Sequence, residues 1–130
     1  HVEFPAETDP LTAHDVIDNI ENDFLQKDRL QVTIHYDPIV TADASVGVLR
    51  ARLQEHARQL DPQLSIHDLR IVPGDSHTNV LFDLVFPAGY AGDIDQMLAK
   101  MCQFVKEQDP KYCCVVKVEQ SYASALPDKK

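Results

Sequence analysis

The sequence has few cysteines, and none of them falls in a recognised motif. Cys102, Cys113 and Cys114 are an odd number, and no CxxC spacing occurs. This argues against a disulfide-stapled secreted scaffold and favours a reducing, cytosolic setting. Neighbours on a strand point to opposite faces, so Cys113 and Cys114 are not expected to share a metal ion. Cys102 lies among apolar neighbours of a predicted helix, where we expect a buried, inert thiol.

Basic residues are also scarce. The chain has 12 Lys and Arg against 21 Asp and Glu, which gives a net charge of −9. Nucleic acids and anionic membranes bind clusters of Lys and Arg, so neither is an expected partner. The sequence has no signal peptide and no apolar run of membrane length, so this segment is not expected to insert into a membrane.

The motifs of common enzyme classes are missing as well. There is no GxGxxG and no GxxxxGK[ST], which leaves a nucleotide site unsupported. No serine lies in a nucleophile-elbow context, and no HExxH occurs. We therefore predict that the chain is not an enzyme.

Hydrophobic periodicity, by contrast, is regular and predicts an α+β fold. Strict alternation in "VTIHYDPIV", residues 32–40, predicts a strand with His35 and Asp37 on one face. Asp9 and Pro10 are the expected N-cap and first residue of a helix. The predicted order is strand 1–4, helix 10–26, strand 30–38, helix 46–60, strands 65–74 and 78–87, helix 93–108 and strand 112–122, followed by a mobile tail at 123–130.

The last six of these elements have the order βαββαβ, which is the ferredoxin-like split βαβ sandwich. We expect this motif from Leu30 to about Tyr122, with an extra strand and helix before it. Its antiparallel sheet would carry helices on one face only. The other face would be free to meet a second copy of the chain, and we predict a homodimer.

The chain also repeats itself weakly, because strand–helix–strand from residue 1 to 37 aligns with strand–helix–strand from 83 to 119. The pairs are His1 with Asp83, His14 with Gln96, His35 with Lys117, Asp37 with Glu119, Val2 with Leu84, Ile34 with Val116 and Pro5 with Pro87. We therefore predict a partial first module at 1–40 and a second module at 41–122. The first copy is expected to lack its N-terminal portion, which would make the chain a piece of a larger protein.

Four potential metal ligands would converge in the first copy: His1, His14, His35 and Asp37. Imidazole and carboxylate groups suit Zn²⁺ or another divalent transition-metal cation. Asp37 would instead be an acceptor that orients an imidazole if it does not bind the metal itself. The alternative is that these side chains form an ordinary solvated surface, and the residues alone leave both interpretations open.

The second copy keeps none of these ligands and is interpreted as structural. Lys117 is expected to pair with Asp83 or Glu119 across strands. His67 in "IHDLR" and His77 in the next turn are weaker metal candidates, because a lone strand histidine is more often an ordinary hydrogen-bonded group. We also expect His56, in the middle of a helix, to be solvated.

The combination "HVEFP…LTAHDVIDNIENDF…VTIHYDP" resembles the cytoplasmic C-terminal domain of cation diffusion facilitator transporters. In that family a strand with "HxE", a helix that opens with "AH" and a strand that ends "IHxDP" recur in this order. The match covers about the first 38 residues, and a looser one runs from Val46 to Tyr122, with the family's "HDLR" strand at 67–70. The matching residues are His1, Glu3, Ala13, His14, Ile34, His35, Asp37 and Pro38.

The resemblance implies an αββαβ domain that dimerises below a membrane-embedded divalent-cation/proton exchanger. It implies that His1, His14, His35 and Asp37 bind Zn²⁺ or a related ion. We therefore expect a non-enzymatic regulatory and dimerisation region of a bacterial cation efflux transporter, on the cytoplasmic side of the cell membrane. Its partners would be a second copy and the transmembrane domain of its own chain. The tandem second module departs from the family plan, and the alternative is a metal-independent ferredoxin-like module that dimerises or binds a small ligand.

Overall fold

Each α-helix begins at an aspartate whose carboxylate accepts a hydrogen bond from the first helical turn. In the computed structural model, which describes residues 1–121, Asp9 Oδ2 accepts from the Thr12 amide at 3.1 Å. Asp43 and Asp93 cap the next two helices in the same way. These caps satisfy backbone N–H groups that have no partner within the helix. The helices are α1 (Pro10–Asp23), α2 (Ala44–Leu60) and α3 (Ile94–Gln108), and a π-helical segment, η1 (Phe24–Asp28), extends α1.

The strands form two separate sheets. A parallel pair joins β1 (Val2–Pro5) to β2 (Tyr36–Ile39). The second sheet has the order β3 (Ser65–Val72), β4 (Thr78–Pro87), β5 (Tyr112–Ser121), with β4 antiparallel to β3 and parallel to β5. The fold is therefore α+β, as the periodicity predicts, and it is compatible with a ferredoxin-like sandwich. The tail expected at 123–130 lies outside the described residues.

One predicted strand differs from the structure in length and in pairing. The strand expected at 30–38 is confined to β2, and it pairs with β1 instead of joining the three-stranded sheet. Part of the reason is local, because Glu21 Oε1 accepts the Ile34 amide proton at 2.9 Å. That backbone donor is satisfied by a side chain and not by a neighbouring strand. The three-stranded sheet with its two helices consequently has the order αββαβ.

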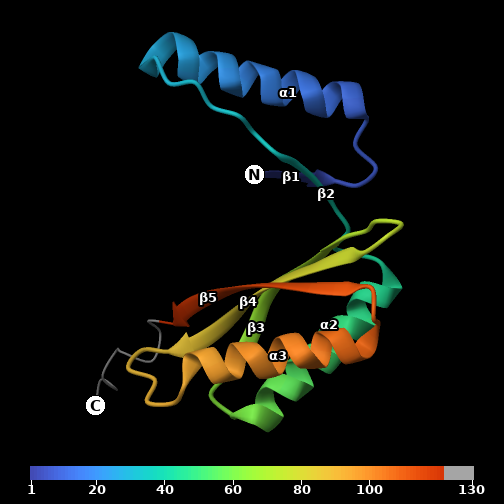
Figure 1. Ribbon diagram of the computed structural model, residues 1–130, viewed down its shortest axis with the longest axis vertical. Helices are drawn as coiled ribbons and strands as arrows, with labels where there is room; N and C mark the ends of the chain where they lie inside the picture. The colour runs from blue at the N-terminus through green and yellow to red at the C-terminus, as the bar shows by residue number, and fades with distance from the viewer. Residues whose placement is uncertain (122–130) are drawn as a thin grey trace, which may run out of the picture. The chain divides into compact units, whose positions relative to one another are not determined.

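The chain divides into two compact units, residues 1–40 and the residues from Thr41 onward. In the second unit α2 and α3 cover the same side of the sheet (Figure 1). Alternate side chains of the central strand β4 face these helices and are at most 1% exposed: Val80, Phe82, Leu84 and Phe86. In the first unit the buried apolar side chains are only Ala13 and Ile17, both on α1. The second unit therefore holds nearly all of the buried core.

The two parallel strand pairs share one register. Val2 of β1 pairs with Tyr36 of β2, and Leu84 of β4 pairs with Val118 of β5. Leu84 follows Val2 by 82 positions in the chain, and Val118 follows Tyr36 by the same 82 positions. This is the displacement of the repeat predicted from the sequence. The helices follow a different displacement, because their capping residues, Asp9 and Asp93, are 84 positions apart. Counted from the caps, His14 corresponds to Leu98 and not to Gln96, because the loop before the helix is longer in the second unit.

None of the helices in residues 1–121 is long and apolar enough to span a membrane.

Candidate metal site in the first unit

Three of the four predicted metal ligands lie together beside the β1–β2 pair. His1 Nδ1 is 2.9 Å from Asp37 Oδ2, and the His1 ring stacks on the His35 ring with centroids 4.9 Å apart and planes at 19°. The pairing of Val2 with Tyr36 produces this arrangement, because it places His1 beside His35 on the neighbouring strand. The His1 side chain is 69% exposed and that of Asp37 is 25% exposed. The cluster is therefore open to solvent.

The fourth predicted ligand, His14, lies elsewhere in the unit. It is exposed on α1 and lines a pocket with Ile17, Ile34 and Tyr36. Ile34 and Tyr36 alternate along the chain with His35 and Asp37, so their side chains point to the opposite side of the strand. The buried positions Ala13 and Ile17 fix this orientation, because they turn the His14 edge of α1 toward the pocket. The structure thus brings together His1, His35 and Asp37, but not His14.

The three clustered side chains have the chemistry of ligands for a divalent transition metal, but their geometry is not that of a formed metal site. Two imidazoles and a carboxylate are the ligands that Zn²⁺ prefers. Within residues 1–121, however, no three His, Cys, Asp or Glu side chains are placed to hold a metal ion together. Asp37 accepts a hydrogen bond from His1, which is the contact expected of an acceptor that orients an imidazole and leaves the other ring nitrogen available.

The second unit has a network of charges at the equivalent positions. Asp83 lies between His67 and Lys117 in the register of the three strands, and His67 Nδ1 is 3.9 Å from Glu119 Oε2. Partial burial raises the pKa of Asp83, and the nearby carboxylates of Asp68 and Glu119 raise it further. The Lys117 ammonium acts in the opposite direction. This strand face therefore gathers three carboxylates, those of Asp68, Asp83 and Glu119, around one lysine and one histidine.

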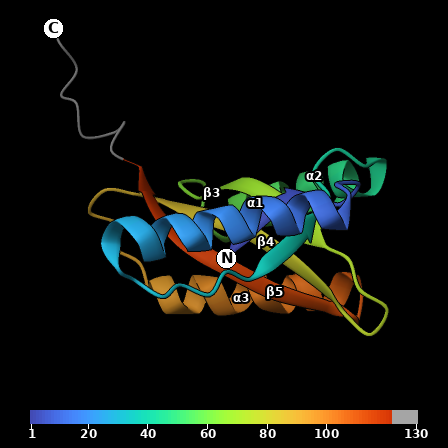
Figure 2. The same cartoon turned by 90° about the horizontal axis from the view of Figure 1, so that it is seen from above.

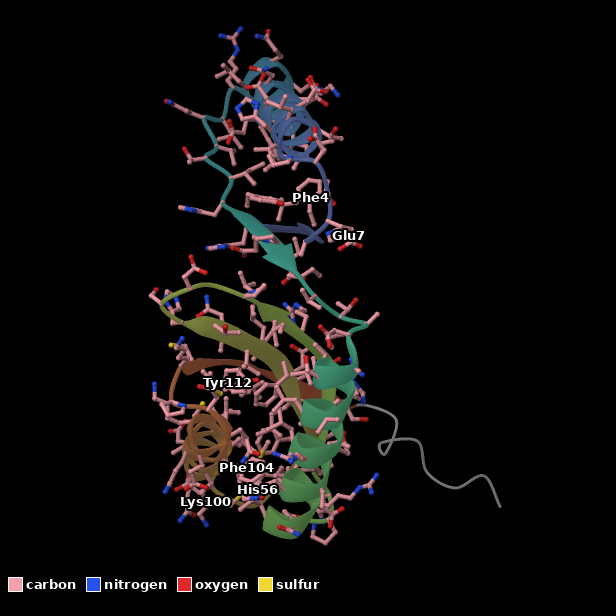
Figure 3. All side chains as sticks on the ribbon, turned by 90° about the vertical axis from the view of Figure 1, so that its right-hand side faces the viewer. Phe4, Glu7, His56, Lys100, Phe104 and Tyr112 are labelled. Carbon is pink, nitrogen blue, oxygen red and sulfur yellow. The ribbon has the colours of Figure 1, made fainter. Side chains whose placement is uncertain are left out.

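Two contacts have no counterpart in the sequence analysis. His56, expected to be solvated, stacks on Phe104 with centroids 3.9 Å apart and planes at 5° (Figure 3). Cys102, expected to be an inert thiol, lies with its sulfur 2.6 Å from Cys114 Sγ. Burial raises the pKa of the Cys114 thiol, and the hydrogen bond from Cys102 adds to the shift. The first contact joins α2 to α3, and the second joins α3 to β5, the next element of the chain. Both depend on how these elements pack together; the inward position of Cys114 in the alternation of β5 was the only available signal.

Comparison of the chain with protein-family models, curated proteins and solved structures finds no match.

Proposed function

We propose that this chain is a regulatory and dimerisation region of a divalent-cation efflux transporter, with a metal-sensing site at His1, His35 and Asp37. The observation that carries the proposal is the convergence of these three side chains, which are up to 36 positions apart, on one exposed strand face. Two imidazoles and a carboxylate are brought together there, with the His1 ring in contact with both of the others.

The order of elements supports the same family. The second unit has the order αββαβ, which is what the resemblance to cation diffusion facilitator domains implies. The first unit repeats the βαβ half of that order with the same strand register. A duplicated domain explains both facts together. The first copy would carry the metal site, and the second would extend the dimer interface.

His1 and His35 would hold the ion through ring nitrogens, and Asp37 would either bind it or orient His1. When bound, Zn²⁺ or a similar cation supplies positive charge to a chain whose net charge is −9. Structural zinc sites usually have four ligands, so we propose that a second copy completes the site. His14 is the predicted ligand left for this role, because it is exposed and faces away from the cluster in its own unit.

Regulation would then follow from a population shift. A cation that binds only when two copies are correctly placed stabilises that arrangement over the others. The transmembrane domain would be connected to this region in the same chain. It would respond to the arrangement of the cytoplasmic dimer. Binding of the transported ion would in this way report its cytoplasmic concentration to a bacterial transporter, with no chemical step carried out by this chain.

The alternative is a metal-independent dimerisation or small-ligand module. It is supported by the finding that no three donor side chains within residues 1–121 are placed to hold a metal ion together. Thermal unfolding and sedimentation with Zn²⁺, with Cd²⁺ and with a chelator separate the two proposals. Metal sensing predicts a higher melting temperature and more dimer in the presence of metal. A dimer whose mass and melting temperature are the same with and without either ion would support the alternative and contradict metal sensing.

A further inference from the structure

Two cysteines of the second unit meet across the packing of a helix on a strand. Cys102 lies on α3 and Cys114 on β5, and their sulfur atoms are 2.6 Å apart. Non-bonded heavy atoms are most stable at about 3.5–4 Å, whereas a disulfide joins its sulfurs at about 2.05 Å. Forming the bond therefore requires a movement of only about 0.5 Å. The two sulfur atoms are therefore already close to the bonded distance.

The surroundings hold the pair in this position. Figures 1 and 2 both show α3 running alongside β5. Met101, next to Cys102, is fully buried, and Cys114 pairs with Val80 of the central strand, which is fully buried too. Both cysteines are themselves half-buried, so a small oxidant can reach them. Cys113 points to the opposite face of β5 and takes no part.

We propose that Cys102 and Cys114 form a reversible disulfide that links α3 to β5 when the chain meets a low-molecular-weight disulfide such as oxidised glutathione. The Cys102 thiolate attacks one sulfur of oxidised glutathione, which releases one glutathione thiolate and leaves a mixed disulfide. The Cys114 thiol then loses its proton to solvent and attacks the Cys102 sulfur, which expels the second glutathione. Two cysteine thiols are oxidised to one disulfide, and one glutathione disulfide is reduced to two thiols.

Cys102 is the first thiol to react because Cys114 is a poor nucleophile. Burial and the neighbouring thiol raise the pKa of Cys114 and so deplete its thiolate. Proximity compensates in the second step, because a neighbouring thiol reacts at a high effective concentration. The product closes a short loop and constrains the unfolded chain, so the oxidised protein should be more stable to heat.

Oxidation with glutathione disulfide, followed by thiol counting in denaturant and by tryptic mass spectrometry without reductant, tests the proposal. Cleavage after Lys100, Lys106, Lys111 and Lys117 leaves Cys102 in one peptide but both Cys113 and Cys114 in the other. The Cys113→Ser variant therefore decides the assignment, since each peptide then holds a single cysteine. We expect it to lose both free thiols, to yield the linked peptides 101–106 and 112–117, and to melt about 5 °C or more higher than its reduced form.

The Cys102→Ser and Cys114→Ser variants should show no such linkage and no rise in melting temperature. Two free thiols retained in oxidised Cys113→Ser, glutathione adducts without a linked peptide, or a link between separate chains would each overturn the proposal. Should Cys114→Ser fail to fold, the peptide link in Cys113→Ser still decides the matter. The outcome is independent of metal binding, because the pair belongs to the second unit.

Discussion

His1 Nδ1 lies 2.9 Å from Asp37 Oδ2, across a parallel strand pair whose members are joined by a helix. The contact exists because β1 and β2 pair with Val2 opposite Tyr36. This pairing places His1 beside His35, the residue immediately before β2, and near Asp37. It fixes one ring nitrogen of His1 and leaves the other free. The metal proposal therefore gives Asp37 a role of its own, separate from that of the imidazoles.

The first prediction concerns that role. Asp37→Asn keeps the size of the side chain but replaces the carboxylate that holds the His1 ring. Outer partners of metal-bound histidines are typically worth about 10–100-fold in affinity, and we expect a loss of that size for Zn²⁺ measured by competition with a chromophoric chelator. Asp75→Asn, a change in the exposed β3–β4 turn, is the control and should leave the affinity unchanged. An Asp37→Asn protein with wild-type affinity would remove Asp37 from the site.

The second prediction concerns the independence of the second unit. Of the buried apolar side chains in the described part of the chain, all except Ala13 and Ile17 lie in residues 41–121, so this fragment should fold alone. We expect cooperative thermal unfolding and a dispersed amide spectrum from it. The separate fragment 1–40 should be unfolded, because chains below about 40 residues rarely bury enough surface to fold. A disordered 41–121 fragment would show that its core needs the first unit.

The third prediction concerns the core of that unit. Leu53 on α2 is fully buried, and Leu53→Ala leaves a cavity that should lower the free energy of unfolding by about 3–5 kcal/mol. Val48 lies on the same helix but is 55% exposed, so Val48→Ala should change it by less than about 0.5 kcal/mol. Urea unfolding followed by circular dichroism measures both variants. Equal losses in the free energy of unfolding for the two variants would mean that α2 packs against the sheet with a different face.

The fourth prediction concerns pH. The pKa of Asp83 is raised in the folded protein, so the folded state holds this proton more tightly than the unfolded chain does. The stability that Asp83 contributes is fully present below the unfolded pKa and is lost as the pH rises through the folded pKa. Asp83→Asn cannot ionise, so it should unfold at a higher urea concentration than wild type at pH 7. This gain should shrink as the pH falls toward about 4.

Asp75→Asn serves again as the matched control, because this carboxylate lies in an exposed turn. Its urea midpoint should follow that of wild type at both pH values. A gain for Asp83→Asn that stayed constant from pH 7 to pH 4 would show that the variant stabilises by another route. A loss at pH 7 would mean that the attraction to Lys117 outweighs burial and the neighbouring carboxylates.

Much of the fold was predictable because its signals are local. Asp9 caps α1 as expected, and Thr78–Pro87 forms β4 with the predicted bounds. The displacement of 82 positions between the two parallel strand pairs could be inferred because alternate residues of each strand share a face, so strand pairing preserves the pattern of apolar positions. These features depend on neighbours in sequence or on a period of two, which the residues themselves display.

The remaining features depend on how separate elements pack against one another. The alternation in 32–40 is the same whether that strand pairs with β1, as the predicted convergence of His1 with His35 and Asp37 requires, or joins the other sheet, as the predicted βαββαβ order requires. The alternation alone does not decide between the two. The position of His14 depends on how α1 is rotated, and the caps shift that helix by two residues relative to the strands. The contact between Cys102 and Cys114 likewise requires the placement of α3 on β5, which no local pattern encodes.

Calorimetric titration with Zn²⁺ of the wild-type chain and of His35→Ala is the most direct test of the metal-sensing site. His77→Ala is the control, because His77 lies in the exposed turn between β3 and β4. We predict saturable binding to wild type and to His77→Ala, and no measurable heat of binding to His35→Ala. Absence of saturable binding to wild type, or binding that His35→Ala leaves intact, would contradict the assignment of His1, His35 and Asp37 as a metal-sensing site.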